Sequence, residues 1–172
     1  IVFKQVQPGA YALNDYDFKA PRKNLRTVLN QPRNHALADF EMYDYPGEYV
    51  EPGDGNNYSR IRLQELLAQH EIAQGRGNAA GLAVGCLFSL SECPREDQNR
   101  EYLIVSAVHR LESDEYESFA EAGISGKPYQ GEITVIEAKQ PYRAPRITPK
   151  PVVQGPQTAI VVGPAGEEIY TD

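Results

Sequence analysis

Three histidines are the side chains of this sequence best suited to acid-base chemistry at neutral pH. His35 lies in a turn-like segment, His70 falls on the apolar side of a predicted helix, and His109 alternates with its neighbours in a predicted strand. None of the three belongs to a local base or nucleophile signature. We therefore expect satisfied or surface histidines and no catalytic residue among them.

Glycine-containing motifs that could hold a nucleophile, a metal or a phosphate are incomplete. GISG (123–126) lacks the G-x-S-x-G spacing and strand-to-helix context of a nucleophile elbow. GDGNN (53–57) lacks the alternating Asp/Asn pattern and the closing Glu of a calcium loop, and is expected to be a turn before a helix with Asn57 or Ser59 as N-cap. GRGNAAG (75–81) follows a predicted helix, the reverse of a phosphate loop. We expect no metal and no cofactor.

Carboxylates gather in ESDEYESFAEAGISGKPYQ (112–130). The acidic residues considered for paired acid-base work are Glu112, Asp114, Glu115, Glu117 and Glu121. Glycosidase-like chemistry needs two carboxyl groups at a defined separation in a cleft, and a long charged loop does not supply that. A solvated acidic face is therefore expected there, and the role of this insertion is left open.

The two cysteines, Cys86 and Cys93, cannot make a four-ligand zinc site without further ligands. Cys86 stands in the apolar run GLAVGCLFSL, which favours a small buried thiol. A disulfide between them is possible but has no support in the sequence, and reduced thiols fit a cytoplasmic origin.

Composition narrows the classes of function. The 172 residues suffice for one domain of ordinary size with an appendage. The formal net charge is −7, and the excess negative charge precedes residue 141, which argues against a nucleic-acid backbone as partner. No apolar run approaches the roughly 20 residues of a membrane-spanning helix.

Six segments alternate between apolar and polar residues, which predicts strands. They are 9–18, 24–29, 38–45, 82–90, 101–111 and 132–138. The apolar faces expected in the last three are Leu82, Val84, Cys86 and Phe88; Leu103, Val105 and Ala107; and Ile133 and Val135. The pattern predicts a mainly β chain folded as an antiparallel barrel or sandwich.

One segment breaks this pattern. SRIRLQELLAQHEIAQ (59–74) places Leu63 and Leu67 at helical spacing, is rich in helix formers, and is stopped by Gly75 and Gly77. It predicts a single amphipathic helix laid on the β-body.

The chain from Pro141 onward joins a proline-dense connector to two predicted strands, TAIVVG (158–163) and EEIYT (167–171). Two strands alone are marginally stable in water, so this pair predicts the opening of a further β-domain. The other end begins in a strand-like run, IVFKQVQPG, without an initiator Met. Together these patterns predict a slice through a longer polypeptide.

Four motifs closely resemble the VgrG family, the spike proteins of bacterial type VI secretion systems, also known as Rhs-element Vgr proteins. They are NDYDFKAPRKNL (14–25), FEMYDYPGEY (40–49), NREYLIVSAVHRL (99–111) and PYRAPRITPKPVVQGPQTAIVVGPAGEEIYTD (141–172). In that family the N-terminal part resembles the baseplate hub of contractile phage tails. The resemblance implies that residues 1–140 are the second hub β-barrel with one packed amphipathic helix, 141–156 a Pro-rich linker, and 157–172 the first strands of an OB-fold.

The resemblance also implies a structural role without catalysis in this fragment. A homotrimer of the intact protein would dock on the hexameric tube of haemolysin-coregulated protein, carry the membrane-puncturing needle, and take effectors as further partners. No nucleic acid and no small-molecule substrate is expected. Such a protein assembles in the bacterial cytoplasm and is then secreted or translocated into target cells.

Other classes of function remain as alternatives. A baseplate hub of a contractile phage or prophage tail shares the structural class. An enzyme is kept in view because some family members carry toxic domains beyond the needle. A carbohydrate-binding β-module is weakened by the absence of Trp.

Within the resembling motifs, one residue set is the candidate structural or interface motif. It comprises Tyr16, Asp17, Phe18, Tyr43, Tyr45, Pro46, Gly47, Gly163 and Pro164. Tyrosine rings with a polar tip suit both a core and a subunit contact, so the sequence leaves both settings open for the aromatic members.

Overall fold

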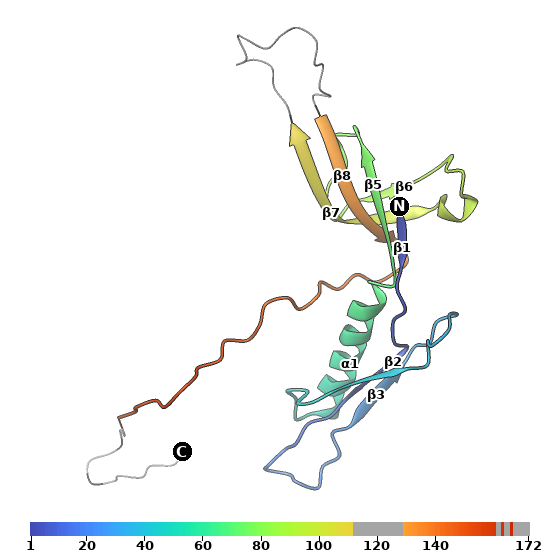
Figure 1. The fold of residues 1–172 in the computed structure, drawn as a ribbon. Helices are drawn as coiled ribbons and strands as arrows, with labels where there is room; N and C mark the ends of the chain where they lie inside the picture. Colours follow the sequence, from blue (N-terminus) through green and yellow to red (C-terminus); the bar gives the residue numbers. More distant parts are fainter. Residues whose placement is uncertain (112–128, 161–162, 164–165, 167–172) are drawn as a thin grey trace, which may run out of the picture.

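Across its described residues, 1–111, 129–160, 163 and 166, the chain forms two β-sheets and one α-helix in this computed structural model (Figure 1). The five-stranded sheet has the order β1 (Val2–Lys4), β5 (Glu71–Gly77), β8 (Tyr129–Glu137), β7 (Glu101–Leu111) and β6 (Leu87–Ser89). The three-stranded sheet has the order β3 (Thr27–Asn30), β2 (Ala10–Leu13) and β4 (Glu41–Asp44). The helix is α1 (Pro52–Leu67), and a 3-10 turn covers Glu96–Gln98.

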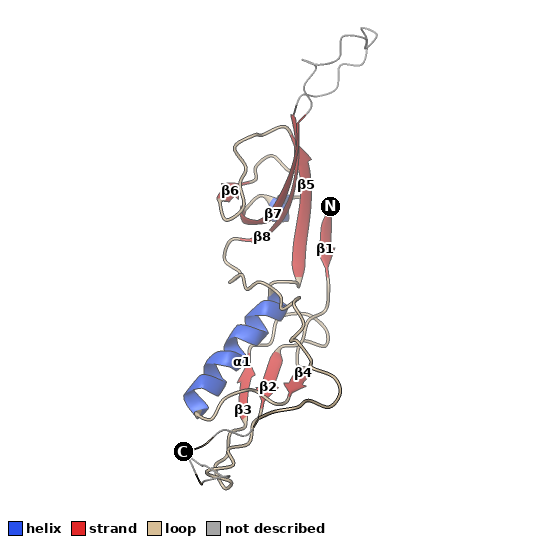
Figure 2. Ribbon diagram, turned by 90° about the vertical axis from the view of Figure 1, so that its left-hand side faces the viewer, coloured by secondary structure: helices blue, strands red, loops and turns tan. Residues whose placement is uncertain are grey.

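The prediction of a mainly β fold with a packed helix is confirmed. Among the described strands every ladder is antiparallel except the one between β2 and β4. Helix α1 covers one face of the three-stranded sheet (Figure 2). There Tyr11 and Leu13 of β2 pack with Leu63 and Leu67 of α1. A second core around Tyr102 lies on the five-stranded sheet, so each sheet has its own hydrophobic core.

Helix α1 begins earlier and ends earlier than the predicted helix at 59–74. Pro52 occupies the first turn, where its missing N–H costs no hydrogen bond and its fixed φ suits a helix. The prediction of a turn at GDGNN (53–57), with an N-cap at Asn57 or Ser59, is therefore wrong. Those residues form the first turns of α1, and Glu51 stands at the N-cap position.

Strand β5 occupies residues that were predicted as the end of the helix. Glu, Ala and Gln in HEIAQ favour a helix locally, but the segment pairs with β1 on one side and β8 on the other. Tertiary pairing outweighs a weak local propensity. Gly75 and Gly77 lie within this strand and do not stop the helix, which ends at Leu67.

Strand β7 has the predicted bounds, 101–111, but its buried face is shifted. Ile104 is 1% exposed and Tyr102 is also buried, whereas Leu103 and Val105 are half-buried. The pairing register slips between Ile104 and Ser106, which makes Val105 the extra residue of a β-bulge. A bulge reverses the alternation of faces, so Ala107 packs against the same core cluster that contains Ile104, although the two residues are three positions apart.

Four of the other predicted strands are shorter than expected, whereas β8 (Tyr129–Glu137) starts before the predicted 132–138 and is longer. Strands β2, β3 and β4 overlap the segments 9–18, 24–29 and 38–45 but span four residues each. Of the predicted strand 82–90, only Leu87–Ser89 forms a strand. Leu82 and Phe88 pack on the second core as predicted, whereas Val84 and Cys86 are exposed. The expectation of a buried Cys86 is wrong because this stretch is an irregular loop over the sheet. The predicted face of Ile133 and Val135 on β8 is confirmed.

Two short connections join the sheets, β1 to β2 and α1 to β5, and they are fastened to each other. Gln5 N–H donates to His70 O at 2.8 Å, and His70 Nδ1 lies 2.6 Å from Gln5 O. The His35 ring from the β3–β4 connection stacks on His70 with ring centroids 4.5 Å apart. His70 therefore lies outside α1, contrary to its predicted place on the helix, and serves as a junction residue.

The connector after β8 is an extended segment without helix or strand among its described residues (Figure 1). Ile147, Val152 and Ile160 are each more than three quarters exposed. Residues 158–160 are not in a strand, and most of the two predicted strands beyond them lies outside the described residues. The acidic segment 112–128, with GISG (123–126), also lies outside them. Within the part of the chain that is described, no helix is long and apolar enough to cross a bilayer.

Candidate interaction surface

The aromatic residues of the first two motifs are exposed. Tyr16 and Phe18 lie in the connection after β2 and are 58% and 76% exposed. Tyr43 on β4 and Tyr45 just after it are 53% and 55% exposed. These four side chains are therefore not part of the core of this chain, and we call them the aromatic surface.

Parallel pairing of β2 with β4 brings the two motifs together. Because the strands run in the same direction, the segments that follow Leu13 and Asp44 leave from the same end of the sheet. Gly47 N–H donates to Asn14 O at 2.9 Å, which joins those segments directly. Asp15 Oδ2 then accepts from the next two backbone N–H groups, at 2.5 Å and 3.3 Å. The aromatic surface thus rests on a hydrogen-bonded base.

The other predicted motif residues shape these loops. Asp17 accepts from Lys19 N–H at 2.9 Å through its side chain and closes a turn. The Tyr45–Pro46 peptide bond is cis. Gly163 is exposed and far along the connector, and Pro164 lies outside the described residues. The structure therefore gathers the members between residues 16 and 47 and leaves Gly163 apart from them.

No sequence pattern singled out Tyr49, although it ends the second motif. Its buried hydroxyl donates to Leu25 O and lies 3.3 Å from Thr27 Oγ1. A Cβ on Gly47 or Gly55 would lie 2.3 Å or 2.4 Å from atoms of its ring, so both glycines leave room for this side chain. The sequence signal that could have identified Tyr49 is its position between Gly47 and Gly55 in a stretch that also contains prolines. Tyr49 anchors the loop that follows β4 and carries Tyr45.

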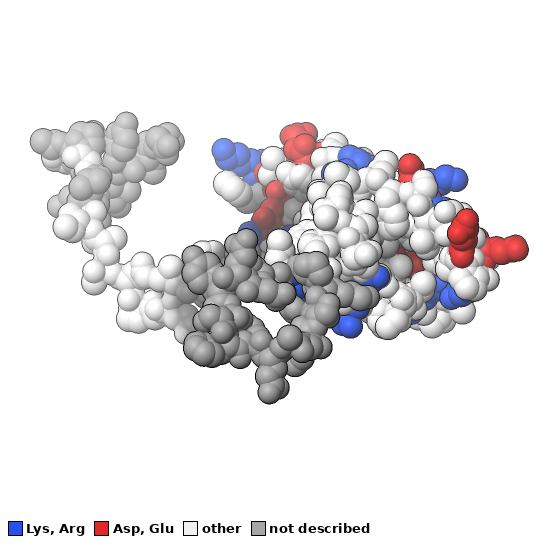
Figure 3. Space-filling model, turned by 90° about the horizontal axis from the view of Figure 1, so that it is seen from above, with Lys and Arg blue, Asp and Glu red and all other residues white. Residues whose placement is uncertain are grey.

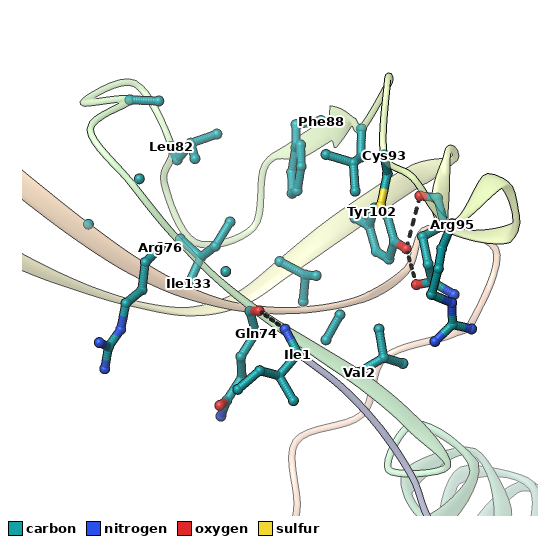
Figure 4. A pocket seen from close by; sticks show the side chains of 18 of the residues that line it. Ile1, Val2, Gln74, Arg76, Leu82, Phe88, Cys93, Arg95, Tyr102 and Ile133 are labelled. Atoms are coloured by element: carbon teal, nitrogen blue, oxygen red, sulfur yellow. Dashed lines mark hydrogen bonds between the residues drawn. The ribbon is translucent and has the colours of Figure 1, made fainter.

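A second candidate site is an apolar groove of about 530 Å³ on the five-stranded sheet (Figure 4). Leu82, Phe88 and Ile133 contribute much of its wall. Polar atoms at its margin already have partners. Tyr102 Oη lies 2.7 Å from Gln98 Oε1.

The rim of this groove holds the third histidine. The Nδ1 atom of His109 lies 2.6 Å from Tyr129 Oη, and the two rings stack. No group of three His, Cys, Asp or Glu side chains suited to a metal was found among the described residues. The chemistry that the groove offers is apolar contact.

Charges on the face seen from above are interspersed around a broad area that carries neither sign (Figure 3). A surface that follows a nucleic-acid backbone carries one continuous basic stripe, and the described residues visible on this face form none (Figure 3).

An ion cluster ties four strands of the larger sheet together. Glu71 on β5 pairs with Lys4 of β1 at 3.1 Å and with Arg100 next to β7, and Arg100 also reaches Glu137 of β8 at 3.2 Å. Burial raises the pKa of Glu71, but hydrogen bonds and charges from Lys4 and Arg100 outweigh burial and lower the pKa overall.

We predict that the Glu71 cluster makes stability depend on pH in acid. Because the folded-state pKa is below the ordinary value of 4.5, the stabilisation is present above that pH and is lost as the pH falls through the folded-state value. Urea unfolding at pH 7 and pH 3 should therefore show a smaller difference for Glu71→Gln than for the unchanged protein. Glu101→Gln, on β7 of the same sheet, is the control. An equal loss of pH dependence in both variants would contradict the assignment to Glu71.

Comparison with known proteins identifies the family. A family model described as phage tail baseplate hub (GPD) matches residues 2–115, well over half of the chain. The chain belongs to the phage tail baseplate hub family. Both sheets, α1 and the aromatic surface of this hub-family chain lie largely within the matched range.

Curated relatives of this hub-family chain are VgrG proteins. It is 50% identical to the type VI secretion system spike protein VgrG1a of Pseudomonas aeruginosa over 169 residues, which are 98% of this chain and 26% of that protein. VgrG1b of the same organism is 50% identical over 98% of this chain and 22% of its own length. The actin cross-linking toxin VgrG1 of Vibrio cholerae is 34% identical over 98% of this chain and 15% of its own length. The resemblance to the VgrG family is confirmed, and the chain spans about a quarter of the length of the first two relatives.

Proposed function

We propose that this chain is a structural hub segment of a type VI secretion spike and performs no catalysis itself. The observation that carries the proposal is 50% identity to the spike protein VgrG1a along nearly the whole chain. The match to the phage tail baseplate hub model supports the same class of function. In the intact protein the segment forms a homotrimer that docks on a hexameric tube protein and carries the needle, with effectors as further cargo.

The proposed division of the chain follows the fold. Residues 1–140 form the second hub barrel, 141–156 the linker, and 157–172 the beginning of an OB-fold. The extended, exposed ribbon from residue 147 to 160 supports a linker between two bodies. The protein assembles in the bacterial cytoplasm and is then secreted or translocated.

The aromatic surface is the proposed contact with a neighbouring subunit or with the tube. Exposed aromatic clusters mark interaction sites, and aromatic side chains are enriched where subunits meet. The hydrogen bonds between Gly47 and Asn14 and around Asp15 hold the loops below these rings in place, which lowers the entropic cost of binding.

A segment exchange tests the proposed function. The matching 169 residues of VgrG1a are replaced by this chain, and the chimera is examined by light scattering and by binding to purified tube hexamers. A hub segment should give a trimer that binds the hexamer. A folded chimera that stays monomeric and does not bind the tube hexamers would refute the proposal. Unaltered VgrG1a is the positive control, and VgrG1a lacking the segment is the negative control.

The description of the matching family model favours one second candidate, a hub of a contractile phage or prophage tail. The two roles share a mechanism and differ in their assembly. Neighbouring genes for a type VI sheath and membrane complex support the spike, whereas genes for tail fibres and capsid support the phage hub.

A further inference from the structure

The connector is held against the body by its basic residues. Arg143 Nε donates to Gln64 Oε1 at 3.0 Å, and the Arg146 N–H donates to Glu65 Oε1 at 2.8 Å. Arg146 also forms an ion pair with Asp44 at 3.7 Å, and Lys150 pairs with Glu48. Four successive contacts therefore link this segment to α1 and to the end of β4.

The body side of these contacts is a row of acceptors, which we call the acidic row: Asp44, Glu48 and Glu65 with Gln64. Glu65 is 13% exposed in its side chain and is held by Arg62, which binds Oε2 and leaves Oε1 for the connector. The acidic row borders a groove of about 380 Å³ whose other wall includes Ala144 and Arg146. The site is thus built from both the body and the connector.

The spacing of the basic residues matches an extended, proline-rich segment. A polyproline II helix has three residues per turn and would place residues three apart on the same side, and Arg143 and Arg146 contact adjacent residues of α1. Pro141, Pro145 and Pro149 restrict the backbone around them, which lowers the entropy lost on docking. Such a backbone leaves its carbonyl groups free to accept hydrogen bonds.

One body residue still has an unused donor in this groove. Arg62 lines the groove, and its Nη2 is buried without a hydrogen-bond partner among the described residues. A buried donor without an acceptor is costly, and the connector as it lies in the structure does not supply that acceptor. The docking therefore rests on the contacts of Arg143, Arg146 and Lys150.

We propose that the acidic row is a docking site for a basic, proline-rich extended segment, and that the chain's own connector, residues 143–150, is its ligand. Ion pairing across the groove sets the direction in which the chain leaves the body. The pairing involves only residues of this chain, so it holds whether or not the proposed spike function is correct.

Spin labels measure the docking directly. Cys86 and Cys93 are first replaced by serine, and labels are placed at Asn56 on α1 and Val153 on the connector, both exposed. The distance distribution should be narrow in dilute buffer and broad in about 1 M salt, where the screening length falls to about 3 Å. A label pair at Asn56 and Arg22, both on the body, should not respond to salt.

Charge variants separate ion pairing from general stiffness. Lys150→Glu and Arg146→Glu should each raise the undocked fraction by about two- to five-fold, the range expected for the loss of one exposed ion pair. Adding Glu48→Lys to Lys150→Glu should restore the narrow distribution. Lys139→Glu, which alters an exposed charge just before the connector, is the matched control and should leave the distribution unchanged.

Three outcomes would overturn the proposal. The first is a distribution that is equally broad at low and high salt. The second is a narrow distribution that neither charge variant widens. The third is an intermolecular distance in mixtures of singly labelled molecules, which would assign the acidic row to the connector of a second copy.

Discussion

Gly55→Ala will lower the free energy of unfolding by about 2 kcal/mol, although Gly55 lies inside a helix where alanine is normally preferred. The added Cβ would lie 2.4 Å and 2.6 Å from Tyr49 ring atoms and 2.9 Å from Thr27 Cγ2. The ring cannot retreat easily because its hydroxyl is bound to Leu25 O. Overpacking of about 3 kcal/mol, set against a helix-propensity gain of about 1 kcal/mol, leaves the expected loss.

Gly53 provides a matched control in the same turn of α1. A Cβ there meets nothing within 4 Å, so Gly53→Ala should raise stability by up to about 1 kcal/mol. Thermal and urea unfolding of both variants measure the contrast, with the Gly55 variant melting about 4 to 8 °C lower. If the two variants moved stability in the same direction, Tyr49 would not be packed against the start of α1.

Phe18→Ser together with Tyr45→Ser will abolish assembly in the VgrG1a chimera without unfolding it. Both side chains are more than half exposed, so their loss removes little buried apolar area from the monomer. An aromatic anchor at the centre of an interface contributes about 2 kcal/mol or more, so losing two weakens association by at least about a thousand-fold if their effects add. This prediction depends on the proposed function.

Light scattering and tube binding measure the assembly effect, and urea unfolding checks that the chimera keeps its stability. Val84→Ser is the control, because Val84 is 58% exposed but belongs to the loop before β6. If the double variant assembled as well as the control, the aromatic surface would not be part of the interface, and the apolar groove would be the remaining candidate.

Local sequence patterns correctly predicted those elements whose conformation depends mainly on residues close to them in sequence. Strand β7 has the predicted bounds because its run from Tyr102 to Val108 contains apolar, β-branched and aromatic residues that favour a strand. Leu63 and Leu67 were correctly placed on the buried face of a helix. The predicted ends of that helix were wrong. Its start was missed because the prediction relied on helix-forming residues and did not consider that Pro52 is well suited to the first turn.

The candidate surface was only partly accessible from sequence. The motifs pointed to Tyr16, Phe18, Tyr43 and Tyr45, and the structure shows that all four are exposed. Their position at one end of the sheet follows from parallel pairing between β2 and β4, a contact between residues about thirty positions apart. No local period encodes such a pairing, and the interface role of these residues stays a prediction.

Local sequence information was sufficient for the fold class, the family resemblance and the proline-rich connector, because periodicity, long motifs and proline act locally. Long-range contacts determined that EIAQ (71–74) becomes part of β5, that a bulge at Val105 reverses the buried face of β7, and that Tyr49 fits between two glycines. The tertiary structure also brought Arg146 to Glu65 and Asp44. The physical reason is common to all four: a partner distant in sequence supplies the hydrogen bond, the packing surface or the charge that selects one local conformation from several of similar energy.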